Sequence, residues 1–296
     1  METVESLKRK VETAEDLQSV VKTMKALAAV SIRQYEQAVE ALDEYGHTIE
    51  LGLRAVLRER AEGAVFSRLA PRQRMGAVVF GSDQGMCGQL NDQTVTYSLE
   101  SLTKMGVARE DRVFLVVGLR AASQLEQAGE QIEEVLSVSG SATSIGSSVA
   151  AALVTLQRWR DQQGLDHIQL FHSRPLSGAA FQPHDVSLLP LDLEWLERLR
   201  ALKWPTRSLP LYTMDREALF SSLVREYLFV SLYRAFAESL ASENASRLAS
   251  MQAAEKNIEE RLRELSAQYH QQRQMSITSE LLDIVSGFEA LTGEGF

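Results

Sequence analysis

The sequence predicts an α/β protein in which two long helices, one at each end of the chain, pair antiparallel and flank an inserted α/β domain. Helix breakers are scarce at both ends of the 296-residue chain: no proline precedes Pro71, and neither proline nor glycine lies between Pro210 and Gly287. Both ends also carry a heptad pattern of apolar residues, whereas the middle alternates short apolar runs with helical stretches. These features divide the chain into three zones.

The N-terminal arm, residues 1–60, carries one narrow apolar stripe. Steps of three and four residues from Val4 to Val56 meet sixteen positions, of which thirteen are apolar or tyrosine. The exceptions are Gln18, Lys25 and Gly46. The positions between these steps are largely charged, so we expect a single face of this helix to be buried.

The C-terminal arm, residues 211–296, repeats the pattern. From Ala237 to Tyr269, eight of ten stripe positions are apolar or tyrosine, and the register continues loosely through Ile277 to Phe288. At about 1.5 Å per residue the two arms would be ~85 and ~114 Å long. Neither stripe is expected to stay exposed, because each would form a large apolar patch. We therefore predict an intramolecular antiparallel coiled coil, although a bundle or a homodimeric coil also accounts for a heptad stripe.

The middle zone, residues 61–210, predicts a small doubly wound (Rossmann-like) α/β domain. Short apolar runs are expected to form five strands, the third of them the weakest, at residues 76–80, 113–117, 132–138, 168–171 and 186–191. Two helices are expected between these strands, at residues 91–105 and 144–161, with Ser144 as the N-cap of the second.

Composition excludes several classes of function. The chain has 31 basic and 40 acidic residues and a net charge of −9, without a basic stripe, which argues against non-specific nucleic-acid binding. Its single cysteine, Cys87, excludes a disulfide framework and a cysteine-based zinc site. No run approaches the roughly 18 to 20 apolar residues that span a bilayer, and the charged N-terminus predicts no secretory or transit segment. Any membrane association is expected to come through partner proteins.

The residues that could carry chemistry do not predict an active site. The glycine-rich stretch 81–91 follows the first predicted strand, where some α/β proteins dock phosphates, but its spacing matches neither a dinucleotide fingerprint nor a P-loop. Cys87 has no histidine at an activating spacing, and His172 and His184 lack a recognised metal spacing. We expect a structural turn, and no catalytic, cofactor-binding or metal-binding residue. A nucleotide-binding enzyme that uses the Gly85–Gly88 loop, and a self-assembling coiled-coil scaffold, remain alternatives.

Several segments resemble one family along the whole chain. Residues 239–257 (SLASENASRLASMQAAEKN) and 271–288 (QQRQMSITSELLDIVSGF) resemble the C-terminal helix of the gamma subunit of rotary F-type ATP synthases, the second almost position for position. The loop 81–91 (GSDQGMCGQLN), the run LLPL at 188–191 and the segment KTMK at 22–25 are similar to the family's motifs in the same order.

The same segments also depart from the family pattern. Gln84 replaces the usual arginine in the loop, and Gln89 replaces a glycine. The lone Cys87 lacks the regulatory cysteine pair of the chloroplast form. These differences favour a divergent bacterial member, such as the product of a second, alternate F-type ATPase operon.

The resemblance implies a central-stalk rotor subunit that couples proton or sodium flow through the membrane sector to ATP synthesis or hydrolysis by rotation. It implies no catalytic residues and no cofactor of its own, and it implies four partners: the alpha and beta subunits, the epsilon subunit and the membrane c-ring. The location implied is the cytoplasmic face of the bacterial inner membrane, as a peripheral protein. The family's contacts to the alpha–beta ring correspond here to Met24, Lys25, Arg247, Arg273, Gln274, Thr278 and Glu280.

Two of these correspondences have a clear chemical basis. Arg273 suits bidentate pairing with carboxylates on a beta-subunit loop. Gln274 and Thr278 lie four residues apart, on one face of a helix, where both can hydrogen-bond the same loop.

Overall fold

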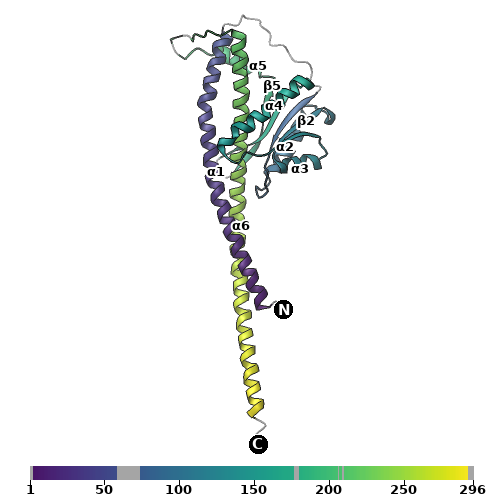
Figure 1. The fold of residues 1–296 in the computed structure, drawn as a ribbon, viewed down its shortest axis with the longest axis vertical. Coiled ribbons are helices and arrows are strands. Elements are labelled where there is room, and N and C mark those ends of the chain that lie inside the picture. Colours follow the sequence, from purple (N-terminus) through teal and green to yellow (C-terminus); the bar gives the residue numbers. More distant parts are fainter. Residues whose placement is uncertain (1–2, 59–73, 177–179, 206, 209, 293–296) are drawn as a thin grey trace. The chain divides into compact units, whose positions relative to one another are not determined.

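A computed structural model of the chain describes residues 3–58, 74–176, 180–205, 207–208 and 210–292 (Figure 1). The chain forms two compact units, one within residues 1–27 and 249–296 and the other within residues 28–248. The boundary expected between residues 60 and 61 lies outside the described residues.

The two long helices are α1, Val4–Arg58, and α6, Arg216–Thr292. Every position of the predicted stripes, from Val4 to Val56 and from Ala237 to Tyr269, is buried or half-buried. In residues 28–248 the stripe of α1 packs against the first part of α6, for example Leu42 and Ile49 with Val230. In the other unit Lys25 and Gln18 of α1 bond to α6, which fixes an antiparallel pair there as well. The predicted pairing of the terminal helices is confirmed.

Five strands form one sheet, in the order β3-β2-β1-β4-β5. Their bounds are β1 Met75–Phe80, β2 Arg112–Val117, β3 Ile132–Leu136, β4 Ile168–Pro175 and β5 Phe181–Leu189. The first four are parallel, whereas β5 is antiparallel to β4. The link from Pro175 to Phe181 is too short for the crossover that a parallel partner needs, so the chain returns as a hairpin. All five predicted strands are present, and β5 starts earlier than predicted.

The helices of this domain are α2 Leu90–Lys104, α3 Leu119–Gln127, α4 Ile145–Gln163 and α5 Leu193–Ala201, with single 3₁₀ turns at Arg109–Asp111 and Ala142–Ser144. The prediction that Ser144 caps α4 is wrong. Ser144 already has helical backbone angles because a 3₁₀ turn leads into α4, and the capping box is formed by Ser141, with Ser144 as its third residue.

The sheet has one apolar core on each face. One face packs against α2 and α3, with Val79 and Phe114 among Val95 and Leu125. The other packs against α4 and the paired helices. On that face the Phe80 ring of β1 meets the Phe236 ring of α6 edge-on, with ring centroids 4.8 Å apart. The α/β domain is therefore attached to α6 through a continuous apolar core.

Candidate functional site

The two polar exceptions in the α1 stripe, Lys25 and Gln18, bond to acidic residues of α6. Lys25 Nζ of α1 forms an ion pair with Glu255 Oε2 of α6, and Gln18 Nε2 donates to Glu259 Oε1 at 3.5 Å. Both ends of the ion pair are partly buried. Polar partners at stripe positions specify the register of a coiled coil at some cost in stability. These two contacts therefore define how the helices align in this unit.

We expect the Lys25–Glu255 pair to contribute little stability and to be sensitive to salt. Because the lysine is about one-third exposed, a double-mutant cycle with Lys25→Met and Glu255→Gln should give a coupling energy of about 0.5–1 kcal/mol. Urea unfolding at low and high salt measures it, and the coupling should shrink at high salt. A coupling energy of zero at both salt concentrations would contradict a role in the register.

A second apolar face runs along the start of α1. Leu17, Val20 and Leu27 are exposed, and with the half-buried Met24 they repeat at steps of three and four residues. More than half of each of these three exposed side chains is accessible. Met24 and Lys25, both predicted contact residues, thus lie at the border between the helix pair and an uncovered apolar face.

The polar contact residues near the end of α6 are all exposed. Arg273, Gln274, Thr278 and Glu280 lie within two turns of the helix. The Thr278 hydroxyl donates to the Gln274 carbonyl at 2.9 Å, which leaves the Gln274 side-chain amide for a partner. Ser276 Oγ donates to Glu280 Oε1 at 3.4 Å. Arg273 has no ion-pair partner among the described residues.

Apolar side chains surround these polar residues. Each of the following is at least 46% exposed: Met275, Ile277, Leu281, Leu282, Ile284, Val285 and Phe288. The loose continuation of the stripe at Ile277 and Leu281 is therefore exposed, and the buried stripe residue of α6 nearest this end, among the described residues, is Leu265. An exposed apolar stretch of this size indicates a surface for another protein.

The last predicted contact, Arg247, belongs to the unit within residues 28–248 and faces inward. Its side chain is only 13% exposed, and Nη2 lies 2.6 Å from Glu243 Oε1. Burial raises the pKa of Glu243, and the neighbouring Arg247 charge partly opposes that rise. Arg247 is thus engaged with its own helix, and a ring contact there requires it to exchange partners.

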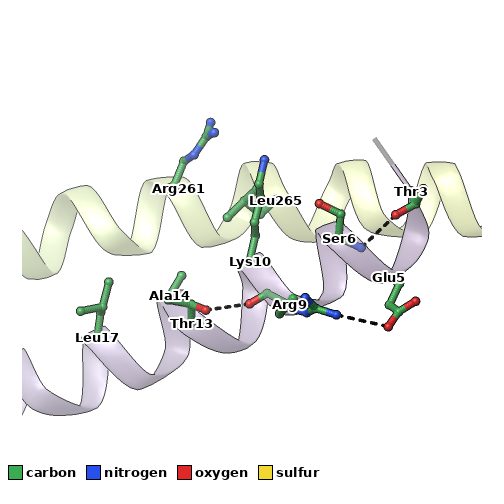
Figure 2. Close-up of a pocket in the computed structure, with 10 residues that line it drawn as sticks. All are labelled: Thr3, Glu5, Ser6, Arg9, Lys10, Thr13, Ala14, Leu17, Arg261 and Leu265. Atoms are coloured by element: carbon green, nitrogen blue, oxygen red, sulfur yellow. Dashed lines mark hydrogen bonds and ion pairs between the residues drawn. The ribbon is translucent and has the colours of Figure 1, made fainter. Parts of the chain in front are cut away.

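A shallow groove of about 560 Å³ follows the first turns of α1 beside α6, within the unit of residues 1–27 and 249–296. Figure 2 shows Leu17 and Leu265 on its two helices, the Arg9–Glu5 ion pair, and the Thr13 hydroxyl donating to the Arg9 carbonyl. Arg261 pairs with Glu264 one turn further along α6. The groove adds charged and hydroxyl groups to this end of the helix pair.

Side chains of the glycine-rich loop form hydrogen bonds with neighbouring elements of the α/β domain. Asp83 Oδ1 accepts from the Leu119 N–H at the start of α3, at 3.0 Å, and Oδ2 accepts from the Val138 N–H at 2.9 Å. Asp83 therefore ties the loop to the start of α3 and to the backbone at Val138. Ser246 Oγ of α6 donates to the Cys87 carbonyl at 2.5 Å, so the loop also packs against α6. Cys87 is buried, as predicted for a structural turn.

Two further findings concern metals and membranes. Among the described residues, no three His, Cys, Asp or Glu side chains are grouped so that they could hold a metal ion. Across the same residues, no helix has the length and apolar content that a membrane span requires.

Paired terminal helices, an inserted α/β domain and an exposed polar and apolar end of α6 define a class of protein that acts by contacting other subunits. The chain belongs to the ATP synthase family, whose sequence profile matches residues 3–291. It is 25% identical over 301 residues to the ATP synthase gamma chain of Nautilia profundicola, covering 98% of this chain and 99% of that one. The predicted resemblance to gamma subunits is confirmed.

Solved structures share the fold. A chain of the Euglena gracilis mitochondrial ATP synthase in rotational state 3 aligns with a TM-score of 0.63 and 20% identity, over 99% of this chain and 96% of that one. A chain of the rotor of the same enzyme in rotational state 1 aligns with a TM-score of 0.60 and 17% identity, over 93% of this chain and 98% of that one. A chain of the central stalk and c-ring of the Tetrahymena thermophila mitochondrial ATP synthase aligns with a TM-score of 0.56 and 19% identity, over 79% of this chain and 99% of that one.

Proposed function

We propose that this chain is the central-stalk rotor subunit of an F-type ATP synthase, coupling ion flow through the membrane sector to ATP synthesis or hydrolysis by rotation. The observation that carries the proposal is the match of the family profile to nearly the whole chain. The solved chains of similar fold belong to F1 with a c-ring, to a rotor, and to a central stalk with a c-ring. The partners proposed here are accordingly the alpha and beta subunits, the epsilon subunit and the c-ring.

The proposed mechanism is conformational coupling without chemistry on this chain. A rotor changes the nucleotide affinity of a beta subunit only if the face it presents interacts differently with two states of that subunit. The terminal helices supply different faces: apolar at Leu17, Val20 and Leu27, and mixed polar and apolar at residues 273–288. Turning such a pair inside a ring of alternating alpha and beta subunits would present each face to each beta subunit in turn.

The proposal assigns different roles to the helical arms and to the α/β domain. The arms at residues 1–60 and 211–296 form the shaft, and residues 61–210 form the domain that joins epsilon and the c-ring. We further propose that the protein is peripheral, at the cytoplasmic face of the bacterial inner membrane, and held there through its partners.

Co-expression with the cognate alpha and beta subunits tests the function. We expect size exclusion to yield a complex with one copy of this chain and an ATPase rate that depends on it. A well-folded chain that forms no complex, or that forms a stable homodimer through its stripes, would instead support the scaffold alternative. Tight binding of ATP by the isolated chain would support the enzyme alternative.

We propose Met24, Lys25, Arg247, Arg273, Gln274, Thr278 and Glu280 as the ring contacts, and Arg273 and Gln274 provide the sharpest test. Losing a charge-assisted hydrogen bond typically costs about 1.5–3 kcal/mol, so Arg273→Leu should weaken assembly or lower the complex's ATPase rate by about tenfold or more. Gln274→Leu should act in the same direction and less strongly. Titration of the ring with each variant, read by ATPase rate, measures both.

Arg120→Leu is the matched control, because Arg120 is an exposed arginine on α3, outside the proposed contacts. It should assemble and support hydrolysis as the unmodified chain does. Undiminished assembly and rate for both Arg273→Leu and Gln274→Leu would remove these two residues from the proposed contacts without affecting the family assignment.

A further inference from the structure

We propose that the packing of β4 and β5 against α6 is controlled by pH through a histidine cluster, His172, Arg174, His184 and Glu238, so that acid weakens the attachment of the α/β domain to α6. The proposal goes beyond the rotor function, which makes no use of these residues. All four lie within residues 28–248, in one compact unit.

The centre of the cluster is a hydrogen-bonded pair between the sheet and α6. His172 Nε2 on β4 donates to Glu238 Oε2 at 2.9 Å, and the two side chains are only 3% and 7% exposed. Arg174 Nε, two residues along β4, lies 3.8 Å from Glu238 Oε1. One α6 carboxylate is thus held by two residues of the same strand. Breaking a buried pair of this kind is costly, because it leaves an uncompensated charge.

His184 places a second imidazole beside this pair. It lies directly opposite His172 in the antiparallel register of β4 and β5, with ring centroids 5.4 Å apart and an interplanar angle of 85°. Both rings line a cavity of about 490 Å³ between the hairpin, α1 and α6. Protons can therefore reach His184, which is only half-buried.

Titratable and charged groups of every neighbouring element lie in or beside the cavity that His184 lines. The hairpin contributes His172, Arg174 and Asp185; α6 contributes Arg234 and Glu238; and α1 contributes Asp43, His47 and Glu50. Three of these are already engaged, because Arg234 forms an ion pair with Asp43 at 2.5 Å and Asp185 accepts from Gln169 at 2.6 Å. Burial lowers the pKa of His184, the nearby His172 and Arg174 lower it further, and Glu238 and Asp185 oppose them.

The signs of both pKa shifts predict a loss in acid. The folded pKa of His184 is below its ordinary value of 6.5, so the unfolded chain takes up the proton first, and stability falls as the pH drops below about 6.5. Burial acts to raise the pKa of Glu238, but the His172 bond and the Arg174 charge outweigh it and hold the value below the ordinary 4.5. Its contribution is present above 4.5 and lost as the pH falls further. As the pH falls, the contribution of His184 to stability is therefore lost before that of Glu238.

Hydrogen–deuterium exchange of the full chain tests the proposal. After correction for intrinsic exchange, protection of β4 and β5 should fall as the pH is lowered from about 7.5 to about 5.5, by at most about tenfold per pH unit for each proton taken up. In His184→Gln this fall should be much smaller. His270→Gln is the matched control, since His270 is an exposed histidine of α6 in the other unit, and it should behave as the unmodified chain.

A titration of the imidazole resonances by NMR gives a second measurement that needs no variant to fold. The pKa of His184 should lie below the ordinary histidine value of 6.5. Hairpin protection that falls equally in the unmodified chain and in His184→Gln would overturn the proposal, and so would a His184 pKa at or above 6.5. Neither result would bear on assembly with alpha and beta subunits, so the proposed function is tested separately.

Discussion

Replacing Phe236 by alanine is expected to lower the free energy of unfolding by about 3–5 kcal/mol, the usual cost of removing a buried phenylalanine. The Phe236 ring is 1% exposed and lies edge-on to Phe80 of β1, between the sheet and α6. Its removal opens a cavity where the α/β domain is attached to the helix. Urea unfolding followed by circular dichroism measures the loss.

Leu282→Ala is the control for this substitution, because Leu282 lies on the same helix and is 60% exposed. Its effect should stay within about 0.5 kcal/mol. A Phe236→Ala variant as stable as Leu282→Ala would mean that the apolar core between sheet and α6 contributes little, contrary to the packing described above.

Replacing Gly118 by alanine is expected to cost at least about 3 kcal/mol, because two penalties add. Gly118 has φ +107°, a conformation that residues with a Cβ rarely adopt, and a Cβ there would lie 2.7 Å from the Ser82 nitrogen and 2.8 Å from the Gly81 carbonyl carbon. Both are backbone atoms of the glycine-rich loop and cannot rotate away. Thermal or urea unfolding of the variant measures the loss.

Gly106→Ala separates the two penalties. Gly106 also has positive φ, +76°, but a Cβ there meets nothing within 4 Å. Only the backbone cost of about 1–2 kcal/mol is expected for it. Equal losses for Gly106→Ala and Gly118→Ala would contradict the close approach of Gly118 to the loop.

The parts of the fold that follow from periodicity were predictable from the sequence. The helical stripes and the strands β1 and β2 each come from a local apolar pattern, and the structure confirms them. The sequence does not predict the start of β5, because the five residues Phe181 to Asp185 form no apolar run and include Pro183. The helices α3 and α5 have nine residues each, too few for the periodic signal to stand out.

Contacts between residues far apart in the sequence could not be predicted from sequence patterns. Gln18 and Lys25 were visible as polar exceptions in the stripe, but their α6 partners depend on the offset between two helices, which a heptad pattern leaves open. The His172–Glu238 pair joins residues 66 positions apart, and no motif links them. The proposed ring contacts rest on the family resemblance, because no local pattern distinguishes them from other residues of a helix surface.

Rotation of this chain inside its ring tests the central claim most directly. Glu110→Cys on the exposed turn Arg109–Asp111 offers a labelling site, because the native Cys87 is buried. With the alpha–beta ring fixed to a surface and a probe on this cysteine, addition of ATP should make the probe turn in one direction, at a rate that follows hydrolysis. A complex that contains this chain and hydrolyses ATP while the probe stays still would contradict the rotor function.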